Sequence, residues 1–309
     1  MNSLGDDAAE DRRFLQTRRT AMRRAAGSVL AGGLASLAGC FGGSGGGSWD
    51  ADREGDLQPW LYDPASYRED VTDYVVGYWE PATFAASRDA LGETANRVQR
   101  YHAAAPEDVE FTVELGGASP SGGLPYVVVS RGSFDAETVR SSLTTGFERV
   151  GSVDDRPLYR DDTGAFIVIA DGELVFVRGL PRGDAESYVT GSRSFASDDD
   201  RLATFFDTVG VGANAGFRLS TDDAGRPTLH GHAYRLDGGA TYARALRVPG
   251  VDEARGEELE SYLEQVRSSV DRLRSASVEY DDERVLLDLE FATAQAPFGV
   301  DPLSNFGLR

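Results

Sequence analysis

The sequence predicts an α+β fold in which helices pack on one face of a mostly antiparallel sheet. Residues 109–115 alternate strictly between apolar and polar side chains, as expected of a strand with one buried face. Asp171-Gly172 separates two apolar runs and is typical of a two-residue hairpin turn. Residues 257–274 carry one apolar stripe at helical spacing. Strands and helices do not alternate regularly, which disfavours a parallel α/β sheet.

The first part of the folded chain, residues 57–196, is expected to form one α+β unit. Its strands are expected at residues 74–79, 109–115, 124–130, 157–160, 165–170 and 173–178. Its helical segments are expected at residues 83–102, 135–145 and 186–190. Asp135 is a good N-cap for the second of these, and Gly92 is a place where the first can break in two.

Residues 197–293 are expected to form a second α+β unit. It starts with a helix from Asp198 to Asp207 and contains the amphipathic helix 257–274. Its strands are expected at residues 213–219, 227–236, 240–246, 276–280 and 285–292. Both units place a helix before strands, which leaves open whether they are a diverged repeat. Residues 294–309 contain two Pro and are expected to be an irregular tail.

The charge balance is strongly acidic, with 31 basic and 51 acidic residues; every basic residue is Arg. The first 39 residues hold six Arg and four acids, so the remainder carries 25 basic and 47 acidic residues, a formal net charge of −22. Nucleic acid and an anionic membrane surface are therefore not expected to bind the folded part. The acidity has two explanations: a local face that binds cations or basic proteins, or a uniformly acidic surface that stays soluble in molar salt. The acids are spread along the whole chain, which favours the second.

The N-terminal 39 residues have the features of an export signal. Arg18 and Arg19 precede Ala25–Ala38, a stretch without charge that is too short for a stable membrane span. Paired Arg before such a stretch resembles a twin-arginine export signal, although Ala21 stands where Phe is common. The resemblance implies transport of the folded protein by the twin-arginine export machinery.

Cys40 is the only cysteine of the chain, so no intramolecular disulfide can form. It ends the segment Leu37-Ala38-Gly39-Cys40, which resembles a lipobox, where the thiol takes a lipid and the Cys becomes the mature N-terminus. Residues 40–56 continue as a Gly/Ser-rich tether. The resemblance implies a lipid anchor on Cys40 at the extracytoplasmic face of the cell membrane.

The absence of Lys beside abundant Arg resembles the proteins of halophilic archaea. Together with the signal and the lipobox, this composition resembles that of exported haloarchaeal lipoproteins of unassigned function. The resemblance covers location and surface chemistry, and it implies no reaction or ligand.

His230 and His232 are the candidate metal-ligating residues. They alternate on an expected strand, which places both imidazoles on one face and within reach of one metal ion. A third ligand is needed, and His102 or a nearby carboxylate would have to supply it. We favour the alternative explanation, a strand face that carries polar side chains toward solvent.

Aromatic residues crowd the start of the expected fold. They are Trp60, Tyr62, Tyr67, Tyr74, Tyr78 and Trp79. Such residues bind sugars or partner proteins in some folds, and in others they pack a first strand onto the core. We favour the packing role.

These observations predict a non-enzymatic, lipid-anchored cell-surface protein that serves as an interaction, envelope or ligand-binding module. The alternatives are a metal-dependent extracytoplasmic hydrolase that uses His230 and His232, or the solute-binding lipoprotein of a transporter. We assign no catalytic residue and expect no cofactor. The expected partners are the membrane, through Cys40, the export machinery, and a protein or small molecule that the sequence does not identify.

The acidic surface predicts that stability depends steeply on salt. A net charge near −22 repels itself, and the screening length falls from roughly 10 Å at 0.1 M salt to roughly 3 Å at 1 M. We expect the melting temperature to rise steeply between these concentrations. A melting curve that is independent of salt would instead favour a localised acidic binding face.

Overall fold

The computed structural model describes residues 51–67, 69–92, 104–119, 122–143, 146–190, 199–222, 224–269 and 273–298. The chain divides into Met1–Gly45 and Gly46–Arg309, and all of the described residues belong to the second unit. The predicted export signal and Cys40 lie outside the described residues.

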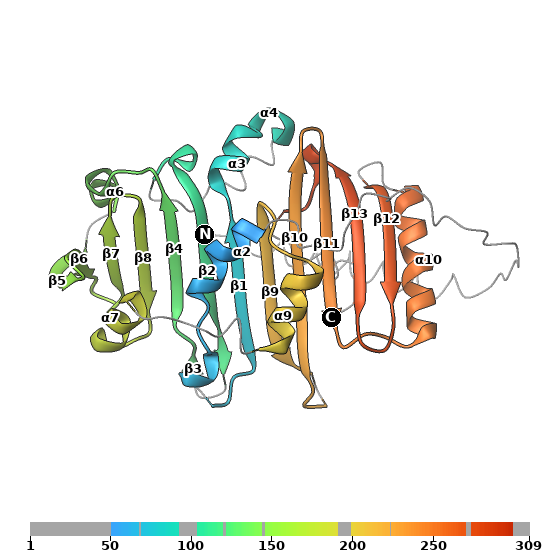
Figure 1. Ribbon diagram of the computed structural model, residues 1–309, viewed down its shortest axis with the longest axis horizontal. Coiled ribbons are helices and arrows are strands. Elements are labelled where there is room, and N and C mark those ends of the chain that lie inside the picture. Colours follow the sequence, from blue (N-terminus) through green and yellow to red (C-terminus); the bar gives the residue numbers. More distant parts are fainter. Residues whose placement is uncertain are drawn as a thin grey trace, which may run out of the picture. The chain divides into compact units, whose positions relative to one another are not determined.

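The described part of the chain contains one antiparallel sheet of 13 strands (Figure 1). The strands are β1 Asp73–Trp79, β2 Val109–Ser119, β3 Gly122–Gly123, β4 Tyr126–Gly132, β5 Glu148–Val153, β6 Arg156–Arg160, β7 Phe166–Ala170, β8 Glu173–Arg178, β9 Asn214–Thr221, β10 Pro227–Asp237, β11 Ala240–Val248, β12 Leu273–Tyr280 and β13 Val285–Ala292. Their order is β12-β13-β11-β10-β9-β1-β2-β4-β8-β7-β6-β5, and β3 pairs with β2. The predicted α+β class with a mostly antiparallel sheet is confirmed.

Seven α-helices and four short 3-10 segments accompany the sheet in the described residues. The α-helices are α2 Ala51–Leu57, α3 Pro81–Ala86, α4 Arg88–Leu91, α6 Ala136–Ser142, α7 Arg182–Thr190, α9 Asp200–Thr208 and α10 Glu253–Ser269. The 3-10 segments are η1 Gln58–Trp60, η2 Pro64–Ser66, η4 Pro106–Asp108 and η5 Thr293–Gln295. None of the described helices is long and apolar enough to cross a membrane.

Several local signals in the sequence produce the expected elements. Asp135 caps α6, where its Oδ1 accepts a hydrogen bond of 2.8 Å from the backbone N–H of Thr138. Asp171-Gly172 forms the turn between β7 and β8, with Gly172 at a φ of 70°. The helix expected from Asp198 is capped one residue later, by Asp199, whose Oδ1 accepts from the N–H of Arg201 at 2.9 Å.

Several elements differ from expectation. The helix expected over residues 257–274 is α10 Glu253–Ser269, and residues 273–274, expected at its end, begin strand β12. Residues 51–56, expected in the tether, belong to helix α2. The helix expected over residues 83–102 is divided in its described part into α3 and α4, and α4 ends at Gly92, which has a φ of 55°. Strand β5 was not expected at all. It pairs with β6 across a turn in which Asp154 and Asp155 both have positive φ, of 48° and 64°. Asp tolerates this conformation better than most residues, so an Asp-Asp pair can form a turn that in most sequences contains Gly.

The two faces of the sheet differ in their side chains. The face that carries Tyr74, Val76 and Tyr78 of β1 is here called the core face, because these residues belong to the largest buried cluster. The opposite face, which carries Val75 and Gly77, is called the outer face. Successive residues of a strand alternate between the two faces, and cross-strand partners share one.

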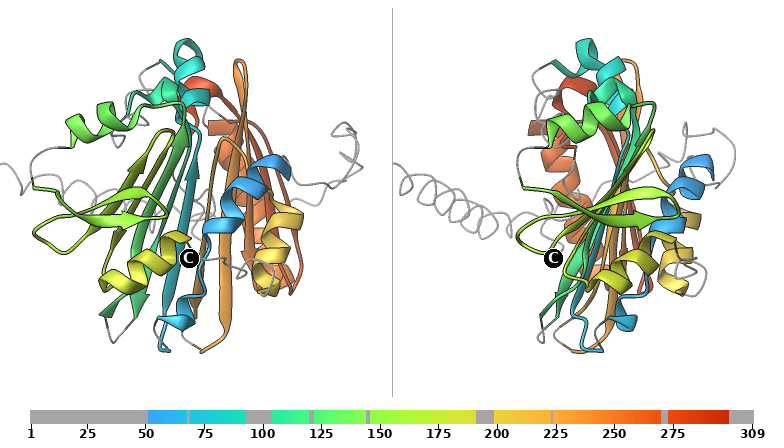
Figure 2. Two further views of the ribbon diagram at one scale, coloured as in Figure 1. Left: turned by 60° about the vertical axis from the view of Figure 1, so that its left-hand side comes forward. Right: turned by 90° about the vertical axis from the view of Figure 1, so that its left-hand side faces the viewer.

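Helices cover both faces of the sheet, so the expectation that they pack on one face is not confirmed. On the core face, Phe205 of α9 contacts Phe217 of β9, with ring centroids 5.2 Å apart. On the outer face, Leu259 and Leu263 of α10 cluster with Leu287 of β13. Figure 2 shows α9 and α2 on one side of the sheet and α10 on the other. A sheet of this width exposes two apolar faces near its ends, and each requires cover.

A division into two related units is likewise not confirmed. Strand β1, from the expected first unit, pairs along its full length with β9, from the expected second unit. The core-face cluster runs through this pairing, since Tyr74 of β1 lies with Phe217 of β9. The sheet is therefore continuous across the boundary expected near residue 197.

The early aromatic residues form part of the core. The rings of Tyr62 and Tyr74 lie 5.1 Å apart, and those of Tyr62 and Tyr188 lie 6.0 Å apart. The hydroxyl of Tyr62 donates to Pro125 O at 2.7 Å, and that of Tyr188 donates to Trp60 O at the same distance. Burial raises the pKa of Tyr62 and holds it neutral. These contacts support the packing role for the aromatic group.

Candidate functional site

His230 and His232 lie on β10 and share the outer face, as the sequence predicted for a strand. Both are half-buried. His230 is opposite Arg218 on β9 and opposite Arg247 on β11. His232 is opposite Gly216 and Ala245, and its ring leans over β9, with Cε1 3.3 Å from where a Cβ on Gly216 would stand.

These neighbours do not complete a metal site. The two residues that flank His230 in register are arginines, which repel a metal cation. The two that flank His232 carry no ligating atom in their side chains. Across the described ranges, no group of three or more His, Cys, Asp or Glu side chains is arranged to hold a metal ion. His102, the third ligand considered from sequence, lies outside these ranges.

The outer face at the centre of the sheet has a different character. One register row runs from His232 through Gly216 and Gly77 to Glu114 of β2. Among the described residues, a Cβ placed on Gly77 would meet nothing within 4 Å, so they leave the backbone there uncovered between His232 and Glu114. The adjacent row contains Val75, which is 43% exposed. We call the residues Val75, Gly77, Glu114 and His232 the central outer site.

Glu114 is the chemically distinctive member of the central outer site. Its side chain is half-buried, and within the described part of the chain its carboxylate has no hydrogen-bond or ion-pair partner. Burial alone raises its pKa, because water solvates the ionised form less well there. A carboxylate in this state accepts hydrogen bonds strongly from any donor that reaches it.

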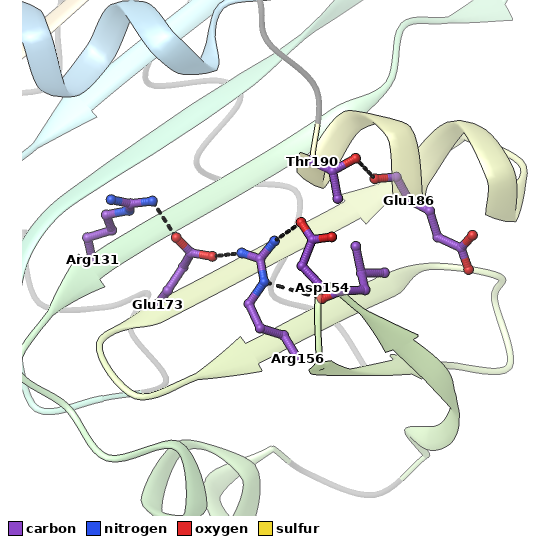
Figure 3. Close-up of polar contacts among 7 residues, drawn as sticks. Arg131, Asp154, Arg156, Glu173, Glu186 and Thr190 are labelled. Carbon is purple, nitrogen blue, oxygen red and sulfur yellow. Dashed lines mark hydrogen bonds and ion pairs between the residues drawn. The ribbon is translucent and has the colours of Figure 1, made fainter.

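Other partly buried carboxylates among the described residues already form ion pairs or hydrogen bonds. Glu173 of β8 accepts from both Arg131 and Arg156, and Arg156 also lies 3.6 Å from Asp154 (Figure 3). The guanidinium of Arg131 stacks over Trp60 at 5.3 Å from the ring centroid. This network joins three strands of the sheet to η1, and it has a structural role.

Glu80 is the second occupied carboxylate. It is buried and pairs with Arg53 of α2, whose Nη2 donates to Oε2 at 2.8 Å. The hydroxyls of Thr83 and Tyr78 also donate to it, at 2.8 and 3.3 Å. Glu80 therefore holds α2 and the start of α3 against the end of β1. Glu114 differs from Glu80 and Glu173 because none of the described residues pairs with its carboxylate.

The sequence-predicted site residues are only partly represented in the described residues. His230 and His232 share one strand face as expected, but they lie in separate rows with different neighbours. Cys40, Arg18 and Arg19 fall outside the described residues. Glu114 was read from sequence only as a polar position of an alternating strand. Its lack of a partner depends on the pairing of β2 with β1 and β4, which no local pattern encodes.

Comparison with known proteins gives no family for this chain. No protein-family model matches it, and no curated protein matches it. Among solved structures, crystal forms III, IV and I of TP0453 match with TM-scores of 0.43, 0.42 and 0.41 and with 9%, 9% and 10% sequence identity. The matches cover 76%, 81% and 76% of this chain and 96%, 98% and 95% of those chains. A likeness at this level supports no inference about function.

The geometry around His230 and His232 predicts no tight transition-metal binding. We expect that the protein retains no stoichiometric zinc or copper after dialysis, measured by elemental analysis. The double variant His230→Ala and His232→Ala should still fold, and its metal content should equal that of the wild type. One equivalent of metal that survives dialysis and is lost in the double variant would make β10 a metal site.

Proposed function

We propose that the protein is a lipid-anchored extracytoplasmic module that binds a ligand at the central outer site and catalyses no reaction. Cys40 and the Gly/Ser tether support the anchoring part of this proposal. The tether would let the folded part move with respect to the membrane. The acidic composition supports a surface that remains soluble in molar salt.

The state of Glu114 carries the binding part of the proposal. A group whose pKa is raised in the folded protein favours folding when protonated and opposes folding when ionised. At neutral pH the ionised Glu114 therefore lowers stability, and the described structure offers no compensating contact. Residues that lower the stability of the fold and make no stabilising contact in it are typical of functional sites.

The backbone at Gly77 also supports a ligand-binding role for the central outer site. Gly weakens a strand interior relative to a β-branched residue, and often marks a place where another molecule approaches the backbone. Because no described residue occupies the space above Gly77, crowding by the described part of the chain does not explain the absence of a side chain there. A ligand at this position could lie on the backbone of β1 and direct a donor to Glu114.

The chemistry of the site defines the class of ligand. Glu114 accepts hydrogen bonds and, when ionised, attracts positive charge. Val75 offers an apolar surface beside it. We therefore expect a small ligand that combines an amine or another strong hydrogen-bond donor with an apolar part.

The stability cost of Glu114 is testable without knowing the ligand. We expect Glu114→Gln to raise the melting temperature at pH 7, because the neutral amide removes the desolvated charge. The gain should shrink as the pH falls toward the usual range of Glu, about 4.3, where the wild-type carboxyl is protonated too. Calorimetry of both proteins between pH 4 and 8 measures this.

Glu110→Gln is the matched control, because Glu110 is an exposed residue of the same strand. It should leave the melting temperature unchanged at each pH. A screen of small amines by thermal shift then tests binding: a ligand that stabilises the wild type and Glu110→Gln should not stabilise Glu114→Gln. If Glu114→Gln melts lower than the wild type at pH 7, the carboxylate is a structural partner and the binding proposal fails.

The anchor is tested separately. Cys40→Ser should leave the protein exported but without lipid, so that it appears in the medium or as uncleaved precursor. Changing Arg18 and Arg19 together to Lys should block export, with Arg23 and Arg24 changed in a second variant because they could substitute. Recovery of the wild-type protein from the cytosol with its first 39 residues intact would contradict the proposed location.

A further inference from the structure

Five aromatic rings form a connected series beside the central outer site. The ring centroid of Trp79, in β1, lies 5.6 Å from that of Phe84 in α3, and Phe84 lies 5.0 Å from Phe298, which follows η5. Phe298 lies 5.3 Å from Tyr234 of β10, and Tyr234 lies 5.7 Å from His232. We call these five residues the aromatic series. It joins strand β1 to strand β10 through segments that are distant in sequence.

The two ends of the aromatic series border the central outer site. Trp79 and Gly77 are alternate residues of β1, so both belong to the outer face. His232 is the other end, and its ring leans over Gly216, the register partner of Gly77. Trp79 and His232 are half-buried, whereas the inner members Phe84 and Tyr234 are buried. The buried members therefore hold the two end rings in place on two sides of Gly77.

Glu114 and Val75 border Gly77 on its other two sides. Glu114 is the register partner of Gly77 on β2, and Val75 precedes Gly77 by two residues on β1. Neighbouring strands are about 4.8 Å apart, and alternate residues of a strand are about 7 Å apart, so all these side chains start close to Gly77. Among the described residues, none reaches within 4 Å of a Cβ placed on Gly77. They leave room there for one group of a ligand.

A carboxylate beside aromatic rings favours a particular kind of cation. The carboxylate of Glu114 attracts positive charge, and the face of an indole ring attracts a cation through its quadrupole. The indole and Val75 also favour apolar atoms over water. An alkylated ammonium meets both conditions, because its positive charge is spread over methyl groups that can contact the ring and the valine.

We propose that the ligand of the central outer site carries a quaternary ammonium group of the choline type, bound over Gly77 between Trp79 and Glu114. This inference rests on the proposed binding function and specifies its ligand. Glu114 supplies the charge that attracts the cation. Trp79 is the residue that selects the methylated form, and His232 supplies a second ring on the side of β9.

Three probes of similar size separate the effect of charge from that of methylation. They are choline, ethanolamine, which keeps the charge but has no methyl groups, and 3,3-dimethylbutan-1-ol, which keeps the shape of choline but has no charge. Each is titrated into the full chain by isothermal calorimetry at pH 7 in about 1 M potassium chloride, which screens long-range attraction to the acidic surface. We expect choline to saturate near one equivalent and to bind at least about threefold more tightly than ethanolamine. The neutral alcohol should show no saturable binding.

Variants of the two selecting residues assign these effects. Trp79→Leu keeps an apolar side chain but removes the indole, so the preference for choline over ethanolamine should disappear, whereas Trp79→Phe should keep part of it. Glu114→Gln should abolish the binding of both charged probes. Tyr242→Leu is the matched control, because Tyr242 is a half-buried aromatic residue of β11 that lies on the core face and contacts Arg235. If Trp79→Leu does not fold, the three probes on the wild type and on Trp79→Phe decide the question.

Three results would overturn the inference: ethanolamine that binds as tightly as choline, a neutral alcohol that does so, or a preference for choline that persists in Trp79→Leu. Ethanolamine binding that is lost in Glu114→Gln would leave the proposed binding function standing without this ligand. If none of the probes binds, the inference also fails. The proposed function is then decided by the melting temperature of Glu114→Gln, a measurement that requires no ligand.

Discussion

The pairing of β1 with β9 is the interaction on which the rest of the structure depends. It joins residues more than 130 positions apart, as the hydrogen bond from Asn214 Nδ2 to Tyr78 O shows, with a length of 3.1 Å. The exposed ion pair between Arg218 and Asp73 crosses the same two strands. Without this pairing, the strands before β9 and those after it would form two smaller sheets, each with an additional edge. Pairing of strands so distant in sequence costs the entropy of closing a long loop before any contact forms. We therefore expect this step to be slow in folding.

The same pairing explains why the two faces serve different purposes. At the centre of the sheet, the apolar residues of β1 and β9 point to the core face, where Phe217 meets α9. The outer face at the centre of the sheet therefore does not have to supply the apolar contacts that stabilise the fold. It can carry Gly77 and Glu114, which has no partner among the described residues, at a modest cost in stability, because the ladder hydrogen bonds and the core-face contacts stabilise both strands. Towards each end of the sheet the outer face is needed for packing again, against α10 and α6.

Sequence reasoning predicted the elements better than their arrangement. The alternation in β2, the cap at Asp135 and the hairpin turn at Asp171-Gly172 are local signals, and they identified a strand, a helix and a turn. Strand β5 was missed because its turn uses Asp154-Asp155, which has no Gly to mark it. The candidate sites were the least predictable part. Glu114 is opposite Gly77 of β1, which lies more than 30 residues earlier in the chain, so its lack of a partner among the described residues cannot be predicted from a local pattern.

The acidic surface limits how this protein can recognise a charged ligand. In molar salt, charges interact over only roughly 3 Å, so a distant acidic surface neither repels an anion nor attracts a cation effectively. Recognition must then come from direct contacts that are held in place before the ligand arrives. The backbone can hold a charged side chain in this way, as the carbonyls of Pro249 and Gly250 do when they orient the guanidinium of Arg247 without neutralising it. A carboxylate in the same position would orient the side chain equally well but would also neutralise its charge.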